Sequence, residues 1–304
     1  MKKNILNNNI VVLCFYTFVV LSSECLGDES YLKDDNINKY LFDGRVFKFV
    51  DLTLSLNKQF AKLSADEKSR VRQADGYDPK YNFIDFCVDI EWIGTSLDLK
   101  HKYDPDTTLR NENLAQQRHT DAVPLERLVV PLIIADISSQ VNGDPNFSLK
   151  KHHLDFFLNN YFGNTAQPCI IVFKFGWWTK NKYDIRRYYG LSDGTNGTSG
   201  TSGTPGISEE VAKWITTNYK NVIGVGVDLP SVDSGSSVYV AHNTLVDAGL
   251  YVVTNVNLEQ YLPDAWCTAL LLPQAGQGAK APVRFVAICP KSRMERHEIP
   301  FHRL

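Results

Sequence analysis

Apolar runs separated by short polar stretches recur along the chain from residue 46 onward, and they predict a series of strands. Several runs are nearly continuous and rich in β-branched and aromatic residues, which is typical of strands buried on both faces of an α/β sheet. The predicted strands cover residues 47–53, 83–93, 131–137, 169–178, 222–233 (with the turn that ends it) and 250–253.

Helical periodicity lies between these runs. Leu154, Phe157 and Leu158 share one face of a helix predicted over residues 151–161. Ser208 is a good N-cap for a helix that runs to about residue 219. A further short helix is predicted to end near Gly249. Strands that alternate with helices favour the α/β class.

The N-terminus has the pattern of a secretory signal peptide. Two lysines precede an apolar run over residues 10–21, and small residues follow it. The run is short for a membrane span, which needs about 20 residues. We therefore predict a secreted protein with residues 1–27 as the signal, cleaved after Gly27. Cleavage after Ser23 and an uncleaved anchor are the alternatives. No later run is apolar enough to span a bilayer, so no membrane association is expected after cleavage.

Composition adds two constraints. The chain has 304 residues with 43% hydrophobic and 22% charged residues, which is ordinary for a globular protein. Its net charge of -2 argues against a nucleic-acid partner, since such a partner requires a basic face.

A Gly/Ser/Thr-rich insert over residues 192–206 has the composition of a flexible loop.

Four of the six cysteines lie beyond the predicted signal, namely Cys87, Cys169, Cys267 and Cys289. Each lies in or beside an apolar run, so buried thiols are the first interpretation. Secretion also permits disulfides, and four cysteines allow three complete pairings, among which the sequence does not choose.

Two tripeptides match the acceptor pattern for N-linked glycosylation. They begin at Asn146 and Asn196, and both lie in turn-rich stretches. The sequence therefore predicts a glycoprotein if both the export and the acceptor patterns are used.

The candidate chemistry is concentrated in residues 92–103. A strand is predicted to end in a Gly-Thr turn at residues 94–95, and the turn is predicted to present Ser96, Asp98, His101 and Lys102 in a short polar stretch. Polar loops at strand ends often carry function in α/β proteins, whereas a solvated surface cluster is the simpler alternative.

This stretch resembles the signature loop of the cyclase family, which includes metal-dependent kynurenine formamidases and isatin hydrolases. The family motif is His-x-Gly-Thr-His-x-Asp-x-Pro-x-His-Phe. Gly94, Thr95 and Asp98 match its frame. The other motif positions differ: Trp92 and Ser96 replace the first two histidines, Lys100 replaces the proline and Lys102 replaces the third histidine.

Further blocks extend the resemblance. Lys174, Gly176 and Trp177 match the family's Arg/Lys-x-Gly-Trp turn, and residues 222–233 match its Gly-Val-Gly-x-Asp-x-x-Ser-x-Asp block. The similar region covers residues 46–290. This leaves a polar N-terminal segment at 28–45 and a C-terminal tail at 291–304. The resemblance implies a swivelling β/β/α domain and a homodimer.

The family's metal centre uses the first two motif histidines, the motif aspartate, a later histidine and a later glutamate. The resemblance implies that Asp98 and His242 are retained ligand positions. The remaining ligand positions hold Trp92, Ser96 and Thr254, and the position of the catalytic histidine holds Lys102. A one-residue deletion would instead bring His101 to that position.

These replacements lead to two hypotheses. The first is a secreted, catalytically impaired family member retained as a binding module for a small molecule or a protein, with no cofactor. The alternative is an active arylformamidase-type hydrolase of tryptophan catabolism, which would convert N-formylkynurenine to kynurenine with zinc or manganese in an altered site. The first is favoured because zinc and manganese need several converging ligands. A scaffold that binds no ligand remains a third possibility.

Overall fold

The computed structural model describes residues 46–74, 95–99, 120, 123–154, 157, 167–191, 203–235, 239–274 and 280–294. The chain divides into a unit Met1–Val46 and a unit Phe47–Leu304, and the elements below belong to the second unit. The predicted signal peptide, the polar segment 28–45 and the predicted strand 83–93 lie outside the described residues.

The strands are β1 (Phe47–Asp51), β2 (Ser96–Asp98), β3 (Val129–Asp136), β4 (Ser148–Leu149), β5 (Cys169–Lys174), β6 (Gly206–Ile207), β7 (Val222–Val227), β8 (Tyr251–Thr254), β9 (Cys267–Pro273) and β10 (Lys280–Pro290). The helices are α3 (Asn57–Phe60), α4 (Ala65–Ala74), η5 (Leu125–Arg127), α6 (Ser138–Val141), η6 (Lys151–Leu154), α8 (Trp177–Asn181), α9 (Ile185–Tyr188), α10 (Glu209–Asn218), α11 (Val240–Asp247) and α12 (Lys291–Met294).

One mixed sheet organises this unit, with the strand order β1-β10-β2-β8-β7-β5-β3-β9. β3, β5, β7 and β8 are parallel to one another, and β2, β9 and β10 join antiparallel. Because β9 also pairs with β10, the sheet closes into a barrel-like ring, and β1 pairs with β10. The α/β content agrees with the predicted class.

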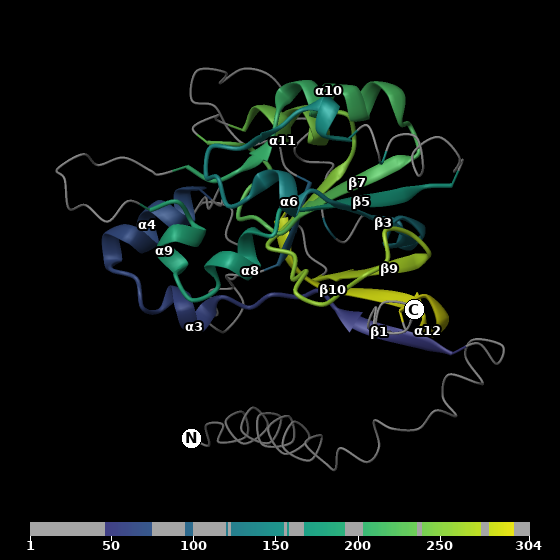
Figure 1. Ribbon diagram of the computed structural model, residues 1–304, viewed down its shortest axis with the longest axis horizontal. Helices are drawn as coiled ribbons and strands as arrows, with labels where there is room; N and C mark the ends of the chain where they lie inside the picture. The colour runs from purple at the N-terminus through teal and green to yellow at the C-terminus, as the bar shows by residue number, and fades with distance from the viewer. Residues whose placement is uncertain are drawn as a thin grey trace, which may run out of the picture. The chain divides into compact units, whose positions relative to one another are not determined.

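The parallel strands are buried on both faces, as their apolar runs predict. In β5, Ile170 and Val172 belong to a core inside the ring, whereas Ile171 and Phe173 belong to a second core on the helix side. Figure 1 shows α10 and α11 above β7 and β5, with β9, β10 and β1 farther down the sheet. Because side chains alternate between the two faces of a strand, each parallel strand contributes residues to both cores.

β7 has glycine at successive positions that face the inside of the ring. A Cβ on Gly224 would overlap the ring of Tyr251, and a Cβ on Gly226 would lie 2.9 Å from Val172 Cγ2. The Gly-Val-Gly sequence of β7 therefore leaves space for an aromatic side chain on neighbouring β8, with which β7 pairs. The glycines serve packing at this point in the fold.

The strand predicted over residues 169–178 stops at the turn that the family resemblance places at Lys174, Gly176 and Trp177. β5 ends at Lys174, and Trp177 begins α8. Gly176 has φ 68°, a left-handed conformation that breaks the strand and that glycine adopts without strain. Trp177 and Trp178 extend the apolar run of the predicted strand, but their side chains are buried from a helical turn.

The helix predicted over residues 151–161 is seen in part. Residues Lys151–Leu154 form the 3₁₀ helix η6, and Leu154 and Phe157 are buried as predicted. The other residues of that prediction lie outside the described ranges. Ser208 caps α10, since its hydroxyl accepts a hydrogen bond from the Val211 N–H at 3.3 Å, which confirms the predicted start.

Two segments predicted from the sequence, the insert over residues 192–206 and the C-terminal tail, overlap with observed elements. Gly206, the last residue of the predicted insert, begins β6, which pairs in parallel with β4. α12 covers the first residues of the predicted C-terminal tail. Across the described ranges, no helix combines the length and the apolar character that crossing a membrane requires.

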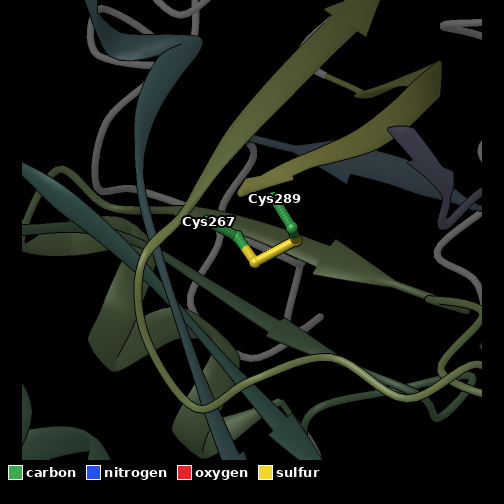
Figure 2. Close-up of a disulfide and its surroundings, with 2 residues drawn as sticks. All are labelled: Cys267 and Cys289. Carbon is green, nitrogen blue, oxygen red and sulfur yellow. A yellow bond between two sulfur atoms is a disulfide. The ribbon is translucent and has the colours of Figure 1, made fainter. Parts of the chain in front are cut away.

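A disulfide joins Cys267 of β9 to Cys289 of β10 (Figure 2). The Cα atoms are 4.3 Å apart, and the neighbouring residues Thr268 and Ile288 are paired in the antiparallel ladder. For these two cysteines the interpretation as buried thiols is wrong, because ring closure brings their strands together. Cys169 is a buried thiol, as predicted, and accepts a hydrogen bond from Asn221 Nδ2 at 3.6 Å.

Removing the disulfide is expected to destabilise the ring. The bond closes a loop with a sequence separation of 22 residues, and loop-closure entropy for that length corresponds to about 3 kcal/mol. The C267A/C289A variant should lose this much free energy of unfolding in urea titrations. A reductant should destabilise the wild type and leave the double variant unchanged. Equal stability of wild type and variant without reductant would contradict this role.

Candidate functional site

The candidate site begins at the pairing of β2 with β8. Ser96 lies opposite Thr254, and Asp98 lies opposite Val252. Leu97, between the two polar residues, belongs to the core inside the ring, whereas Val252 belongs to the helix-side core. Ser96, Asp98 and Thr254 therefore point toward the layer that carries the helices.

His242 reaches this cluster from helix α11. Asp233 fixes the start of that helix, because its Oδ1 accepts hydrogen bonds from the Ala241 N–H at 2.7 Å and the His242 N–H at 3.5 Å. The imidazole Nε2 of His242 lies 3.8 Å from Asp98 Oδ2, within range of an ion pair when the imidazole is protonated. Asp98 and His242, which the resemblance assigns as retained ligand positions, are thus brought together although they lie 144 positions apart in the sequence.

All four side chains are buried. Their exposed fractions are 5% for Ser96, 4% for Asp98, 5% for Thr254 and 1% for His242. The hydroxyl oxygens of Ser96 and Thr254 are 3.3 Å apart and form a hydrogen bond. The expectation that Ser96 and Asp98 lie in a polar loop, or in a solvated cluster, is wrong. They belong to a buried strand between β10 and β8.

Thr95 fixes the entry to this strand. Its hydroxyl donates to the Asn255 carbonyl at 2.5 Å and accepts from the Leu54 N–H at 2.6 Å. Its backbone N–H donates to the Leu54 carbonyl at 2.8 Å, and its own carbonyl accepts from the Val283 N–H at 3.2 Å. One buried threonine therefore connects the segment after β1, the end of β8 and strand β10.

The residue after β8 adopts a left-handed conformation. Asn255 has φ 55°, and its side-chain Oδ1 accepts a hydrogen bond from the Tyr188 hydroxyl at 2.8 Å. Its N–H donates to the Leu229 carbonyl at 2.8 Å. Asparagine tolerates this conformation better than most residues. The turn after Thr254 is thereby held from α9 and from the segment after β7.

Asp228 organises the carboxyl ends of β5 and β7. Its carboxylate is buried and accepts hydrogen bonds from the Phe175 N–H at 2.7 Å and the Trp177 N–H at 3.1 Å. Burial raises the pKa of Asp228 to about 7, although these backbone donors lower it. The matched Asp of the block at residues 222–233 thus fixes the turn that begins α8.

The donor set among the described residues of this site does not fit a metal centre of the family type. Asp98 and His242 supply two ligands, and the neighbouring positions supply neutral hydroxyls that hydrogen-bond to each other. Within the described part of the chain, no three His, Cys, Asp or Glu side chains converge on a point that could hold a metal ion. Zinc sites typically use four ligands, of which three or more come from the protein.

The predicted positions Trp92, His101 and Lys102 lie outside the described residues. The structure places the other predicted positions, Ser96, Asp98, His242 and Thr254, in one cluster. Several residues that position this cluster carried no predicted role, namely Thr95, Tyr188, Asp228, Asp233 and Asn255. Thr95, Asp228 and Asp233 lie in matched motif blocks, which was the available signal. Asn255 lies in a further stretch that continues the resemblance, whereas Tyr188 carried no such signal.

Replacing Thr95 by valine should destabilise the fold. Valine keeps the shape but leaves the Leu54 N–H and the Asn255 carbonyl without this partner, at a cost of about 2 to 4 kcal/mol. Thr95→Ser, which keeps the hydroxyl, is the matched control and should lose much less. Urea unfolding of both variants measures the difference. Similar losses in both would show that the hydroxyl contributes no more than the methyl group, and would contradict this role.

Asp228 should make stability depend on pH. Its pKa is raised from 3.8 to about 7 on folding, so its contribution is complete at low pH and is lost as pH rises through 7. Between the two pKa values, the free energy of unfolding should fall by about 1 kcal/mol per pH unit from this group alone. The difference between wild type and Asp228→Asn, measured by urea unfolding at several pH values, should show this slope. A difference independent of pH would contradict it.

Comparison with known proteins identifies the kind of fold. A family model described as "Putative cyclase" matches residues 50–234. No curated protein matches the chain.

Three solved structures with similar folds are isatin hydrolases. Isatin hydrolase A from Labrenzia aggregata, bound to benzyl benzoate, is 17% identical with a TM-score of 0.57, covering 80% of this chain and 94% of that chain. Isatin hydrolase A from Ralstonia solanacearum is 18% identical with a TM-score of 0.56, covering 80% and 92%. An isatin hydrolase bound to the product analogue thioisatinate is 17% identical with a TM-score of 0.58, covering 87% and 99%.

At these identities the structures show similarity of fold. The family model covers more than half of the chain, and its match begins in β1 and ends just beyond Asp233, the anchor of α11. The chain therefore belongs to the cyclase family.

Proposed function

We propose that this chain is a secreted cyclase-family protein with an impaired metal centre, retained as a binding module for a small molecule or a protein partner. The observation that carries the proposal is the hydrogen bond between Ser96 and Thr254. The resemblance assigns these residues to two ligand positions, and their hydroxyl groups hydrogen-bond to each other across paired strands.

The chemistry of amide hydrolysis supports this proposal. Water attack on an amide needs an activated nucleophile, which metal-dependent hydrolases obtain from metal-bound hydroxide. A carboxylate and an imidazole remain, but hydroxyls at pH 7 are weak ligands for zinc or manganese. Lys102 stands at the position of the family's catalytic histidine, so the sequence also lacks the residue that would transfer protons.

Secretion is part of the proposal. The signal pattern over residues 1–27 supports it, and so does the buried disulfide between Cys267 and Cys289, since structural disulfides persist in oxidising compartments. We further propose the swivelling β/β/α arrangement and the homodimer that the family resemblance implies. The net charge of -2 supports a partner other than nucleic acid.

The alternative is an active arylformamidase-type hydrolase with an altered metal site. The proximity of Asp98 and His242 favours it, because both remain buried and face each other at 3.8 Å. Its substrate would be N-formylkynurenine. The similar fold of the isatin hydrolases adds isatin as a second amide to test.

Metal content decides between the two functions. The purified mature protein, after extensive dialysis, should contain no stoichiometric zinc or manganese by elemental analysis. The same sample should not hydrolyse N-formylkynurenine or isatin. Near-stoichiometric metal together with turnover would overturn the proposal and establish the alternative. If the protein holds no metal and shows no turnover, thermal stabilisation by candidate ligands would separate a binding module from a scaffold without a ligand.

Restoring the ligand positions provides the matched control. A variant carrying W92H, S96H and T254E should gain zinc or manganese, and adding Asp98→Asn to that variant should reduce the gain. Circular dichroism must show that both variants are folded. A folded restored variant that takes up no metal would show that the replaced ligands are not what limits this site.

A further inference from the structure

Asn146 lies in an exposed turn between α6 and β4, and its side chain is exposed. The Asn146 N–H donates to Asp144 Oδ1 at 2.9 Å, which fixes the turn locally. Preceding residues of the same turn include Asn142 in a left-handed conformation at φ 46°. The turn therefore presents an asparagine side chain at the surface on a defined backbone.

The other residues of the acceptor tripeptide are held by the fold. Phe147 packs against the helix-side core, and its carbonyl accepts from the Gly206 N–H at 3.0 Å. Ser148 lies in β4, and its hydroxyl is 3.1 Å from the Ser234 hydroxyl. The turn is thus anchored directly behind Asn146, so a bulky group on its amide can extend away without disturbing the core.

We propose that Asn146 is an N-linked glycosylation site of this protein. The inference rests on the proposed secretion, because glycan transfer to Asn-x-Ser occurs in the secretory pathway. The donor is a lipid-linked oligosaccharide diphosphate. The bond between Asn146 Nδ2 and the anomeric carbon forms, the bond from that carbon to the diphosphate oxygen breaks, and the amide proton is lost to a base of the transferase. No oxidation or reduction occurs.

The order of events follows from the same contacts. The transferase reads the hydroxyl two residues after the asparagine, and in the folded protein that hydroxyl is engaged with Ser234. Transfer therefore precedes the contact between the Ser148 and Ser234 hydroxyls. The finished fold then exposes the modified residue.

The test uses the full chain, expressed in eukaryotic cells with its own N-terminus and, in parallel, behind an independent secretory leader. Enzymatic removal of N-glycans in heavy-oxygen water should convert Asn146 to labelled aspartate, detected by peptide mass spectrometry. A secreted chain with unmodified Asn146 would overturn the site. Export only behind the added leader would count against the proposed secretion, while the glycan would still be measured.

Matched variants separate the acceptor pattern from the fold. Asn146→Gln and Ser148→Ala should each remove one glycan, seen as a single step in electrophoretic mobility. Ser148→Thr keeps the hydroxyl and should retain it. Asn196→Gln controls for the second tripeptide. Loss of the same step in Asn196→Gln, with no change in Asn146→Gln, would assign the glycan to Asn196 and overturn the proposal.

Discussion

The hydroxyl of Thr95 is the contact on which the site geometry depends. It donates to one backbone carbonyl and accepts from one backbone N–H, at Asn255 and Leu54 respectively. Both of those groups are thereby satisfied in a buried location, where an unsatisfied polar group costs about 1 to 3 kcal/mol. Because β2 begins at the next residue, this contact also sets which residue of β8 lies opposite Ser96.

The residues that hold the fold differ from the residues at the predicted ligand positions. Thr95, Asp228 and Asp233 make hydrogen bonds to backbone groups, and these bonds are needed whether or not a metal binds. The ligand positions are different, since Ser96 and Thr254 are short side chains that satisfy each other across paired strands. The hydrogen bonds that hold a fold of the cyclase type are therefore separate from the side chains that the resemblance assigns to the metal ligands.

Closure of the sheet explains the other principal features of this unit. The pairing of β9 with β10 creates an enclosed core, and the disulfide lies within it. The same enclosure requires small residues where large side chains cross, which accounts for Gly224 beneath Tyr251. Packing density of this kind leaves little room for a Cβ at that position.

The sequence alone determined the α/β class, the strand cores and the cap at Ser208, because hydrophobic periodicity and capping chemistry are local. It also determined, through motif resemblance, that Asp98, His242, Ser96 and Thr254 belong together. Only the tertiary structure decided that Ser96–Asp98 is a buried strand and that Cys267 pairs with Cys289. Those outcomes depend on contacts between distant segments, namely the pairing of β2 with β8 and of β9 with β10, and no local pattern encodes them.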